Sequence, residues 1–347
     1  MMKYKPFGSL PSGDRLARIR NSVNYRDGNF QNLTETPVMV EGTSYVKLMR
    51  EFFFTKGVDR EPTQVLPSVK TDLSVHHNEP VVIWFGHSSY LICIDGKNIL
   101  VDPVFESRPS PIQFVGSKNF RSDSPYGVDD LPSLDLVIIT HDHYDHLDYN
   151  TILKIRPKAK RFVTALGVGS HLEFWGINKT KITELDWWEG ESIFPGMELI
   201  ATPARHFSGR GLKRNQTLWN SFVLRTSVYS VFIGGDSGYD ATFREIGNKY
   251  GPFDLAILEC GQYNARWPYI HMMPEQTAQA SVDLQARVFM PVHWARFSLS
   301  LHPWKDPIER VTRQAENLHA LITTPVIGEP IKLGGETLNA PWWDTIK

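Results

Sequence analysis

The chain has 347 residues, and its 37 Lys and Arg against 38 Asp and Glu leave a formal net charge of −1. This balance argues against a nucleic-acid partner, because nucleic-acid binders usually carry a clustered basic excess. The composition, 41% hydrophobic and 22% charged, is typical of a folded globular protein and excludes a disordered one. Cys93 and Cys260 are the only cysteines, which excludes a disulfide framework.

No apolar run approaches the roughly 18 residues that a membrane-spanning helix needs. The first 30 residues are rich in charges and lack the apolar stretch of a signal peptide. We therefore expect a cytoplasmic protein without a membrane-spanning segment.

The first 70 residues differ from the rest of the chain. Prolines interrupt residues 1–71 at five positions, and only Ser44–Phe54 has the pattern of a helix. From residue 81 onward, short apolar runs predict strands, and the Asp95-Gly96 pair between two of them is a strong hairpin signal. We therefore expect an irregular N-terminal extension, residues 1–70, that packs on a core domain, residues 71–347.

Within the core domain, hairpins come early and alternating strands and helices come later. This mixture favours stacked sheets covered by helices over a purely parallel, doubly wound sheet. In chain order, the predicted strands are Val81–Phe85, Tyr90–Ile94, Asn98–Val101, Leu134–Thr140, Arg161–Ala165, Lys181–Trp187, Glu198–Thr202, Ser221–Arg225, Ser230–Ile233, Leu255–Leu258 and Val288–Val292. The predicted helices are Val168–Trp175, Ala241–Tyr250, Pro274–Gln285 and Pro307–Leu321.

Three histidines and three aspartates lie within eight residues, His141–Asp148, directly after a predicted buried strand. His141 and His143 are two residues apart, so on an extended backbone they point to the same side. Asp145 and His146 follow as the chain turns towards a helix. Imidazole and carboxylate ligands suit zinc and similar divalent ions. These ligands would fill one tetrahedral site, or two ions about 3.5–4 Å apart could share them.

Three more candidate ligands follow later apolar runs. His206, Asp236 and His293 each come after the C-terminal end of a predicted strand, where a sheet would place a shared site. A single histidine in such a position is more often structural than a ligand. Three such positions, added to the His141–His146 cluster, favour one common metal site.

These motifs resemble those of the metallo-β-lactamase superfamily, and longer segments are similar to the N-acylphosphatidylethanolamine-hydrolysing phospholipase D family. The similarity covers roughly residues 62–335 and implies an α/β fold, a four-layer αββα sandwich, with residues 71–347 as the hydrolase domain. The segments that carry it include Trp84-Phe85-Gly86-His87, Ser110-Pro111-Ile112-Gln113-Phe114, Leu185-Asp186-Trp187-Trp188-Glu189, Pro203-Ala204-Arg205-His206, Gly235-Asp236-Ser237-Gly238-Tyr239, Arg266-Trp267 and His293-Trp294. The chain departs from the family at Ser88-Ser89, where the family has Ala-Thr, and at Glu259-Cys260-Gly261-Gln262.

The resemblance implies a centre of two zinc ions, with manganese or iron as alternatives. The implied ligands are His141, His143 and His206 for one ion, Asp145, His146 and His293 for the other, and Asp236 as a bridge. Asp145, Asp236 and His271 are implied to be catalytic, with His271 outside the set of metal ligands. The alternative for His271 is a packing role at the start of a helix. A metal-bridging hydroxide would then attack a phosphodiester of the N-acylphosphatidylethanolamine type and release its alcohol, which is a phospholipase D-type cleavage.

Other residues are expected around this centre. Arg266, Lys118 and Arg205 are candidates for contacts with the substrate phosphate. Asp142 and Asp148 are candidates for orienting the imidazoles, although Asp148 equally suits a helix cap. His87, on its glycine turn, would either support the site or be a core histidine.

A phospholipid substrate implies transient contact with a membrane, and so a location peripheral to it. Leu48, Met49 and Phe52–Phe54 are candidates for an interfacial patch, the alternative being that this helix packs on the sandwich. The family's dimers imply a homodimer. Alternative functions are a lactonase of the ascorbate-6-phosphate lactonase type acting on a small molecule, a metal-binding scaffold without turnover, and nucleic-acid cleavage, which the near-neutral charge disfavours.

Overall fold

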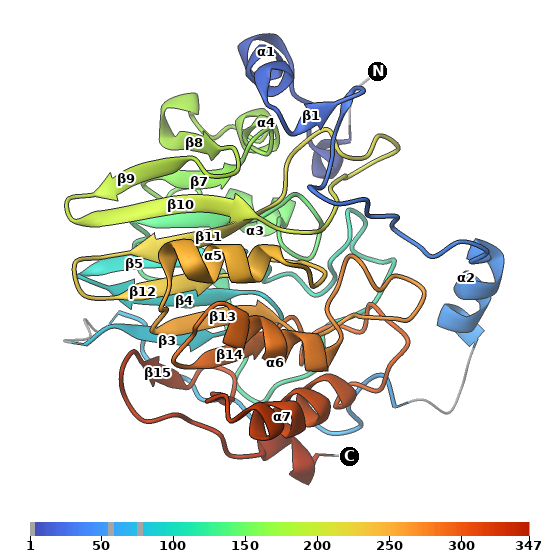
Figure 1. The fold of residues 1–347 in the computed structure, drawn as a ribbon, viewed down its shortest axis with the longest axis vertical. Coiled ribbons are helices and arrows are strands. Elements are labelled where there is room, and N and C mark those ends of the chain that lie inside the picture. Colours follow the sequence, from blue (N-terminus) through green and yellow to red (C-terminus); the bar gives the residue numbers. More distant parts are fainter. Residues whose placement is uncertain (1–3, 55–58, 75–78, 347) are drawn as a thin grey trace.

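The structure, a computed structural model, describes residues 4–54, 59–74 and 79–346. Two large β-sheets face each other, and helices cover their outer faces (Figure 1). The layers are therefore helix, sheet, sheet and helix. This confirms the four-layer αββα sandwich that the motifs imply.

One sheet has seven strands. The pairs β15–β3, β3–β4 and β4–β5 are antiparallel, and β5 to β8 run parallel to one another. In sheet order the strands are β15 (Pro330–Lys332), β3 (Val81–Trp84), β4 (Tyr90–Ile94), β5 (Lys97–Val101), β6 (Leu136–Ile139), β7 (Phe162–Ala165) and β8 (Ile182–Leu185). The hairpin predicted between β4 and β5 is confirmed, with Asp95 and Gly96 at φ 48° and 68° as a two-residue turn with positive φ requires.

The other sheet has six strands, with antiparallel pairs at one side and the parallel pairs β12–β13 and β13–β14 at the other. In sheet order they are β14 (Phe289–Val292), β13 (Leu255–Glu259), β12 (Ser230–Ile233), β11 (Asn220–Arg225), β10 (Met197–Pro203) and β9 (Gly190–Phe194). A small separate pair joins β1 (Tyr25–Arg26) to β2 (Asn29–Phe30). Every strand predicted from the apolar runs is confirmed to within two residues at each end.

Two hydrophobic cores hold the layers together. Along β6, Leu136 and Ile138 face the core between the sheets, whereas Val137 and Ile139 face the core under the helices of the seven-stranded sheet. Successive side chains of a strand point to opposite faces, so a strand buried on both sides must be apolar throughout. This explains why the strands that lead to the site appear in the sequence as continuous apolar runs.

Helices α5, α6 and α7 lie on the side of the six-stranded sheet, and α3 and α4 pack on the seven-stranded sheet (Figure 1). The α-helices are α1 (Gly13–Asn21), α2 (Tyr45–Phe54), α3 (Tyr149–Ile155), α4 (Gly169–Phe174), α5 (Thr242–Tyr250), α6 (Pro274–Asp283) and α7 (Asp306–Leu318). The 3-10 helices are η1 (Lys5–Phe7), η2 (Val128–Asp130), η3 (Lys179–Lys181) and η4 (Trp342–Thr345). The predicted helices are confirmed to within three residues at their ends.

The expectation of a single helix in the first 71 residues is wrong, because α1 precedes α2. Four of its nine residues are charged, and its apolar stripe is too short to be recognised. Contacts with the core stabilise it instead: Ile19 is fully buried, and Arg15 pairs with Glu184 at 2.6 Å and with Glu173 at 3.0 Å. Strands β9 and β15 also went unpredicted, since each lies at the edge of its sheet and has few buried side chains.

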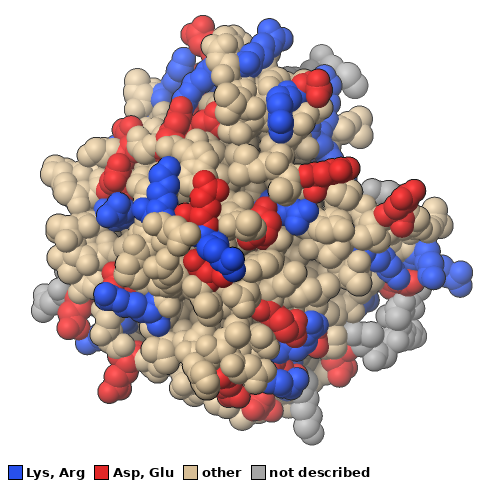
Figure 2. Space-filling model, viewed as in Figure 1, with Lys and Arg blue, Asp and Glu red and all other residues tan. Residues whose placement is uncertain are grey.

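The N-terminal segment follows the surface of the sandwich, and α2 stands at its margin (Figure 1). The division at residue 70 stays a prediction. Lysine, arginine and acidic side chains are interspersed on the face that Figure 2 shows. Among the described residues, no helix has the length and hydrophobicity that crossing a bilayer requires.

Candidate metal centre

The candidate ligands converge at one end of the sandwich, where strands of both sheets deliver them. The segment after β6 carries His141–His146, and His206, Asp236 and His293 follow β10, β12 and β14. The structure therefore brings these seven positions together in one place, as groups of side chains that could hold metal ions. The seven-stranded sheet supplies the first group of side chains, and the six-stranded sheet supplies the others.

Three imidazoles form one group of donors. His141 Nε2 lies 2.9 Å from His143 Nδ1, and His206 Nε2 lies 3.2 Å from the same atom. The three residues can present one nitrogen each within 4.8 Å of one another. His141 and His206 are 1% exposed, so this group is withdrawn from solvent.

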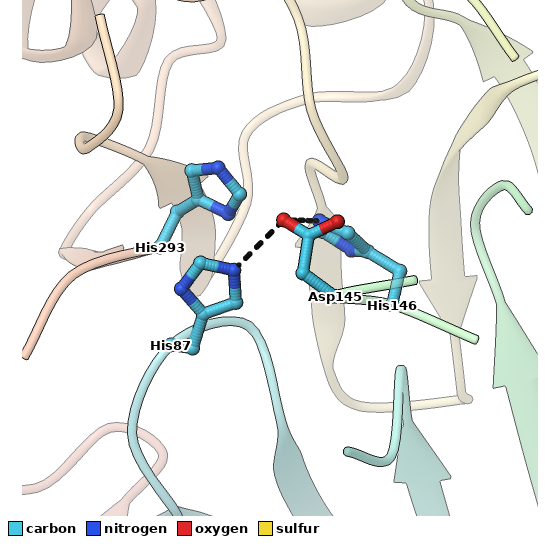
Figure 3. Close-up of side chains that lie close together, drawn as sticks. All are labelled: His87, Asp145, His146 and His293. Carbon is cyan, nitrogen blue, oxygen red and sulfur yellow. Dashed lines mark hydrogen bonds and ion pairs between the residues drawn. The ribbon is translucent and has the colours of Figure 1, made fainter. Parts of the chain in front are cut away.

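A second group joins Asp145, His146 and His293, and it also contains His87 (Figure 3). Asp145 Oδ2 lies 3.1 Å from His87 Nε2 and 3.6 Å from His146 Nε2. The rings of His146 and His293 stack with centroids 5.3 Å apart. His87 therefore supports the site instead of being an isolated core histidine.

Asp236 lies between the two groups. Its Oδ2 is 3.1 Å from His146 Nε2 and 3.8 Å from the Nε2 atoms of both His141 and His206. Its Oδ1 is 3.3 Å from His293 Nδ1. One buried carboxylate thus contacts imidazoles of both groups, the position that a bridging ligand would occupy.

The hydrogen bonds of this site test whether it fits divalent cations. His206 Nδ1 donates to the Ile270 carbonyl at 2.7 Å, and His146 Nδ1 donates to Asp102 Oδ2 at 2.8 Å. In the neutral tautomers that these bonds select, both Nε2 atoms present lone pairs to the interior of the site. Among the described residues, His146 Nε2 and Asp236 Oδ1 are buried without a hydrogen-bond partner. Buried acceptors that face one another without a donor are satisfied by a cation, so the donor set fits metal ions.

Comparison with known families decides the identity of this arrangement. A family model described as the β-lactamase superfamily domain matches residues 97–294. The chain belongs to the metallo-β-lactamase superfamily. Together with the donor set, this membership makes it a metal-dependent hydrolase.

Relatives place the chain within the superfamily. An uncharacterised protein of Mycobacterium tuberculosis (strain ATCC 25618 / H37Rv) is 37% identical over 327 residues, which are 93% of this chain and 87% of the relative. N-acyl-phosphatidylethanolamine-hydrolyzing phospholipase D 1 of Caenorhabditis elegans is 33% identical over 229 residues, 62% of this chain and 64% of its own length. Igni18, a metallo hydrolase from Ignicoccus hospitalis, superposes with a TM-score of 0.57 at 23% identity and covers 75% of this chain and 100% of its own, which shows a shared fold.

In this metallo-β-lactamase site, the carboxylate that orients a ligand is Asp102, which was not predicted. Asp102 directly follows β5, is 1% exposed, and accepts hydrogen bonds from His146 and from Thr140. The available signal was an aspartate immediately after a buried strand.

The two aspartates that were expected to orient the imidazoles have other partners. Asp142 accepts hydrogen bonds from His171 and Thr217, and Asp148 caps α3 by accepting from Asn150 N and Thr151 N.

His271 lies against the cluster of candidate metal ligands. Its ring centroid is 5.0 Å from that of His206 and 5.2 Å from that of His293. His271 Nδ1 lies 3.4 Å from Glu259 Oε2. Burial raises the pKa of Glu259 to about 7, against the lowering effect of His271. Burial lowers the pKa of His271, but the carboxylates of Glu259, Asp236 and Asp145 together raise it overall, so the His271–Glu259 pair can hold a proton at the site.

A cavity of about 680 Å³ opens onto the cluster. Besides the ligands and His271, its wall is largely apolar and includes residues from the N-terminal segment as well as from the hydrolase core. The apolar lining residues include Phe7, Val38, Met39, Leu48, Phe52, Pro109, Phe207, Trp267, Ile270 and Leu299. Of the proposed interfacial patch, Leu48 and Phe52 thus face the cavity, while the side chains of Met49, Phe53 and Phe54 lie outside the described part of the chain.

The three basic residues expected to contact phosphate are not among the residues that line this cavity. Arg205 donates to Thr36 Oγ1 and to the Glu35 carbonyl, and Arg266 pairs with Glu51 at 2.6 Å. Both arginines therefore fasten the N-terminal segment to the core. Lys118 is exposed outside the cavity. The expectation that these three contact phosphate finds no support in this geometry.

Arg210 and Arg214 line the cavity instead. Arg210 is 4% exposed, and its guanidinium donates to the carbonyls of Asp142, Leu147 and Pro6, so its role is to brace the ligand-bearing loop. Arg214 is exposed at the rim with its guanidinium 5.3 Å from the centre of the Phe207 ring. No signal in the sequence separated these arginines from the other basic residues.

Proposed function

We propose that this metal-dependent hydrolase is a zinc-dependent phosphodiesterase that cleaves phospholipids of the N-acylphosphatidylethanolamine type at the phospholipase D position. The observation that carries the proposal is the cavity, in which an apolar wall meets the buried imidazole and carboxylate cluster. Such a cavity suits an amphiphile whose polar reacting group reaches the cluster while its chain contacts the wall. The similarity to the nematode phospholipase D supports this choice of substrate.

The chain's residues would divide the work as follows. His141, His143 and His206 would hold one ion, and Asp145, His146 and His293 the other, with Asp236 between them. Divalent ions at such a site supply a strong nucleophile, because they lower the pKa of bound water towards 7, and they neutralise charge on phosphoryl oxygens. His271 lies beside the cluster on the cavity wall, where it can donate a hydrogen bond to a phosphoryl oxygen.

The function is tested by removing and restoring the metal. The protein is treated with a chelator, and release of N-acylethanolamine and phosphatidate from lipid vesicles is then measured with and without added zinc, manganese or iron. We expect no activity in the metal-free protein and recovery with zinc. If the metal-loaded protein releases neither product, the lipid proposal is wrong. Hydrolysis of a phosphorylated lactone in the same assay would favour the lactonase alternative, although the apolar wall gives that substrate no matching contacts.

Arg214 is the residue that we propose as the contact for an anionic group of the substrate. Within the described part of the chain, no carboxylate forms an ion pair with it, unlike Arg266. The loop that carries Arg214 is closed by two hydrogen bonds: Ser208 N donates to Asn215 Oδ1 at 3.2 Å, and Asn215 N donates to the Ser208 carbonyl at 3.0 Å. A guanidinium at the cavity rim that forms no ion pair with a described carboxylate can bind a phosphate oxygen without giving up another ion pair.

Replacing Arg214 by glutamine should weaken lipid hydrolysis. We expect kcat/KM to fall about 10-fold, because a charge-assisted hydrogen bond at a partly solvated site contributes about 1.4 kcal/mol. Arg244→Gln is the matched control, since Arg244 is an exposed arginine on α5 that pairs with Asp283 away from the cavity. Equal activity of the Arg214 variant and this control would show that Arg214 does not contact the substrate.

A phospholipid substrate also requires access to a lipid surface. We propose that contact with a membrane is transient, as is typical of an enzyme that takes its substrate from a bilayer. Leu48 and Phe52 place apolar groups of α2 at the cavity and so at the position where a lipid chain would enter. A homodimer remains part of the proposal from family resemblance alone.

A further inference from the structure

The turn at residues 86–89, between β3 and β4, is joined to the segment that carries His293. His87 N donates to the Trp294 carbonyl at 2.9 Å, and His293 N donates to the His87 carbonyl at 2.9 Å. Trp84 Nε1 also donates to that carbonyl, at 2.7 Å. His87 and His293 both have positive φ, 53° and 69°, a backbone conformation that costs of order 1–3 kcal/mol and that surrounding contacts must enforce.

The side chains of the same turn reach two candidate ligands. His87 is fully buried, and its Nε2 lies 3.1 Å from Asp145 Oδ2 (Figure 3). Because a carboxylate only accepts, this contact places the imidazole proton on Nε2. Ser88 Oγ lies 2.9 Å from His293 Nδ1, and because a hydroxyl can donate or accept, this contact can hold the orientation of the His293 ring in either tautomer.

The two contacted residues belong to one of the two donor groups. Asp145 and His293 are 58 and 205 residues away from their partners in the turn, so only the folded sandwich brings them to it. Among the described hydrogen bonds, none joins the side chains of the turn to His141, His143 or His206. The side chains of the turn therefore contact only the donor group formed by Asp145, His146 and His293.

We propose that His87 and Ser88 are positioning residues that set the affinity of the metal site formed by Asp145, His146 and His293, and that the other site does not depend on them. The inference rests on the metal centre of the proposed function, but not on its substrate. Groups that orient ligands typically change metal affinity about 10- to 100-fold when they are removed. His87 orients the Asp145 carboxylate by one hydrogen bond, and Ser88 orients the His293 ring.

Three variants of the full chain test the proposal. His87→Leu removes the donor to Asp145, whereas His87→Gln retains an amide N–H at a similar reach. Ser88→Ala removes only the hydroxyl. Each is stripped of metal and titrated with zinc against a chromophoric chelator, and bound zinc is counted by mass spectrometry. Far-ultraviolet circular dichroism and thermal unfolding establish that each variant is folded.

We expect two zinc equivalents in the wild type. In His87→Leu one equivalent should weaken about 10- to 100-fold while the other keeps its affinity, and His87→Gln should restore most of the loss. Ser88→Ala should weaken the same equivalent, and it decides the matter if His87→Leu does not fold. Two unchanged equivalents in the folded variants, or equal weakening of both, would overturn the proposal.

The same experiment separates this inference from the proposed function. A wild-type protein that binds no zinc would contradict the metal centre itself, whereas two equivalents with no effect of the turn would contradict only the role of His87 and Ser88. An anomalous-scattering crystal structure adds a direct readout. A zinc–nitrogen distance of about 2.0–2.1 Å to His87 would make it a ligand and would overturn the positioning role.

Discussion

Asp236→Asn should abolish hydrolysis, with a fall in kcat/KM of at least about 1,000-fold, equivalent to about 4 kcal/mol of transition-state stabilisation. The carboxylate lies within 4 Å of His141, His146, His206 and His293, and it is 3% exposed. Asparagine keeps the size of the side chain but removes the negative charge that would offset two cations. The loss should therefore appear in metal content as well as in rate.

The measurement is lipid hydrolysis at saturating zinc, together with zinc content after gel filtration. Asp240→Asn is the matched control. Asp240 lies four residues further along the same segment and accepts from Thr242 N at the start of α5, a role that asparagine fills equally well. Should Asp236→Asn keep two zinc equivalents and more than about a tenth of the wild-type rate, Asp236 is not the bridge.

Asp102→Ala should be the most destabilising change near the site, with a loss of about 3–5 kcal/mol in the free energy of unfolding. The Asp102 carboxylate accepts three hydrogen bonds at 2.6–2.8 Å, from Thr140 N, Thr140 Oγ1 and His146 Nδ1. Thr140 N and His146 Nδ1 would remain buried without an acceptor, while Thr140 Oγ1 would keep only its contact with His141 Nδ1 at 3.0 Å. Asp102 also has a φ of 41°, a conformation that aspartate and asparagine tolerate better than alanine does.

Chemical denaturation of the metal-free protein gives this loss directly, free of any contribution from metal binding. Asp102→Asn separates the lost acceptors from the strained backbone, because asparagine suits positive φ and keeps one acceptor oxygen. We expect it to lose about 1–3 kcal/mol. Equal stability of the alanine variant and the wild type would mean that the donors find water or other partners, and that Asp102 does not orient His146.

The two variants test different parts of one arrangement. Asp236 touches both donor groups, so its loss should affect the whole centre. Asp102 and His87 each orient a single ligand from outside, and they do so from loops that follow β5 and β3. The geometry of this site depends on contacts between segments that are far apart in the chain. For this reason we expect buried polar residues that do not contact the metal to affect metal binding and stability.

Local patterns were enough to predict most strands of the two large sheets and to single out the candidate ligands. Strands such as β6 are buried on both faces, so their sequences are apolar throughout and can be recognised without any tertiary information. The ligands were recognisable because imidazole and carboxylate groups follow the ends of those strands at short spacings. The edge strands β9 and β15 and helix α1 were not predicted, because contacts with neighbouring segments stabilise them and their own hydrophobic pattern is weak.

The sequence by itself determined the kind of chemistry, because ligand types and apolar strands are local properties of the chain. Only the tertiary structure decided which polar groups serve that chemistry. In the folded chain, Asp102 contacts His146 and His87 contacts Asp145. Arg205 and Arg266 bind the N-terminal segment, and Arg214 lies at the cavity rim. The physical reason is that a hydrogen bond or an ion pair depends on distance in space, and residues that are 44, 58 or 169 positions apart carry no local sign that they will meet.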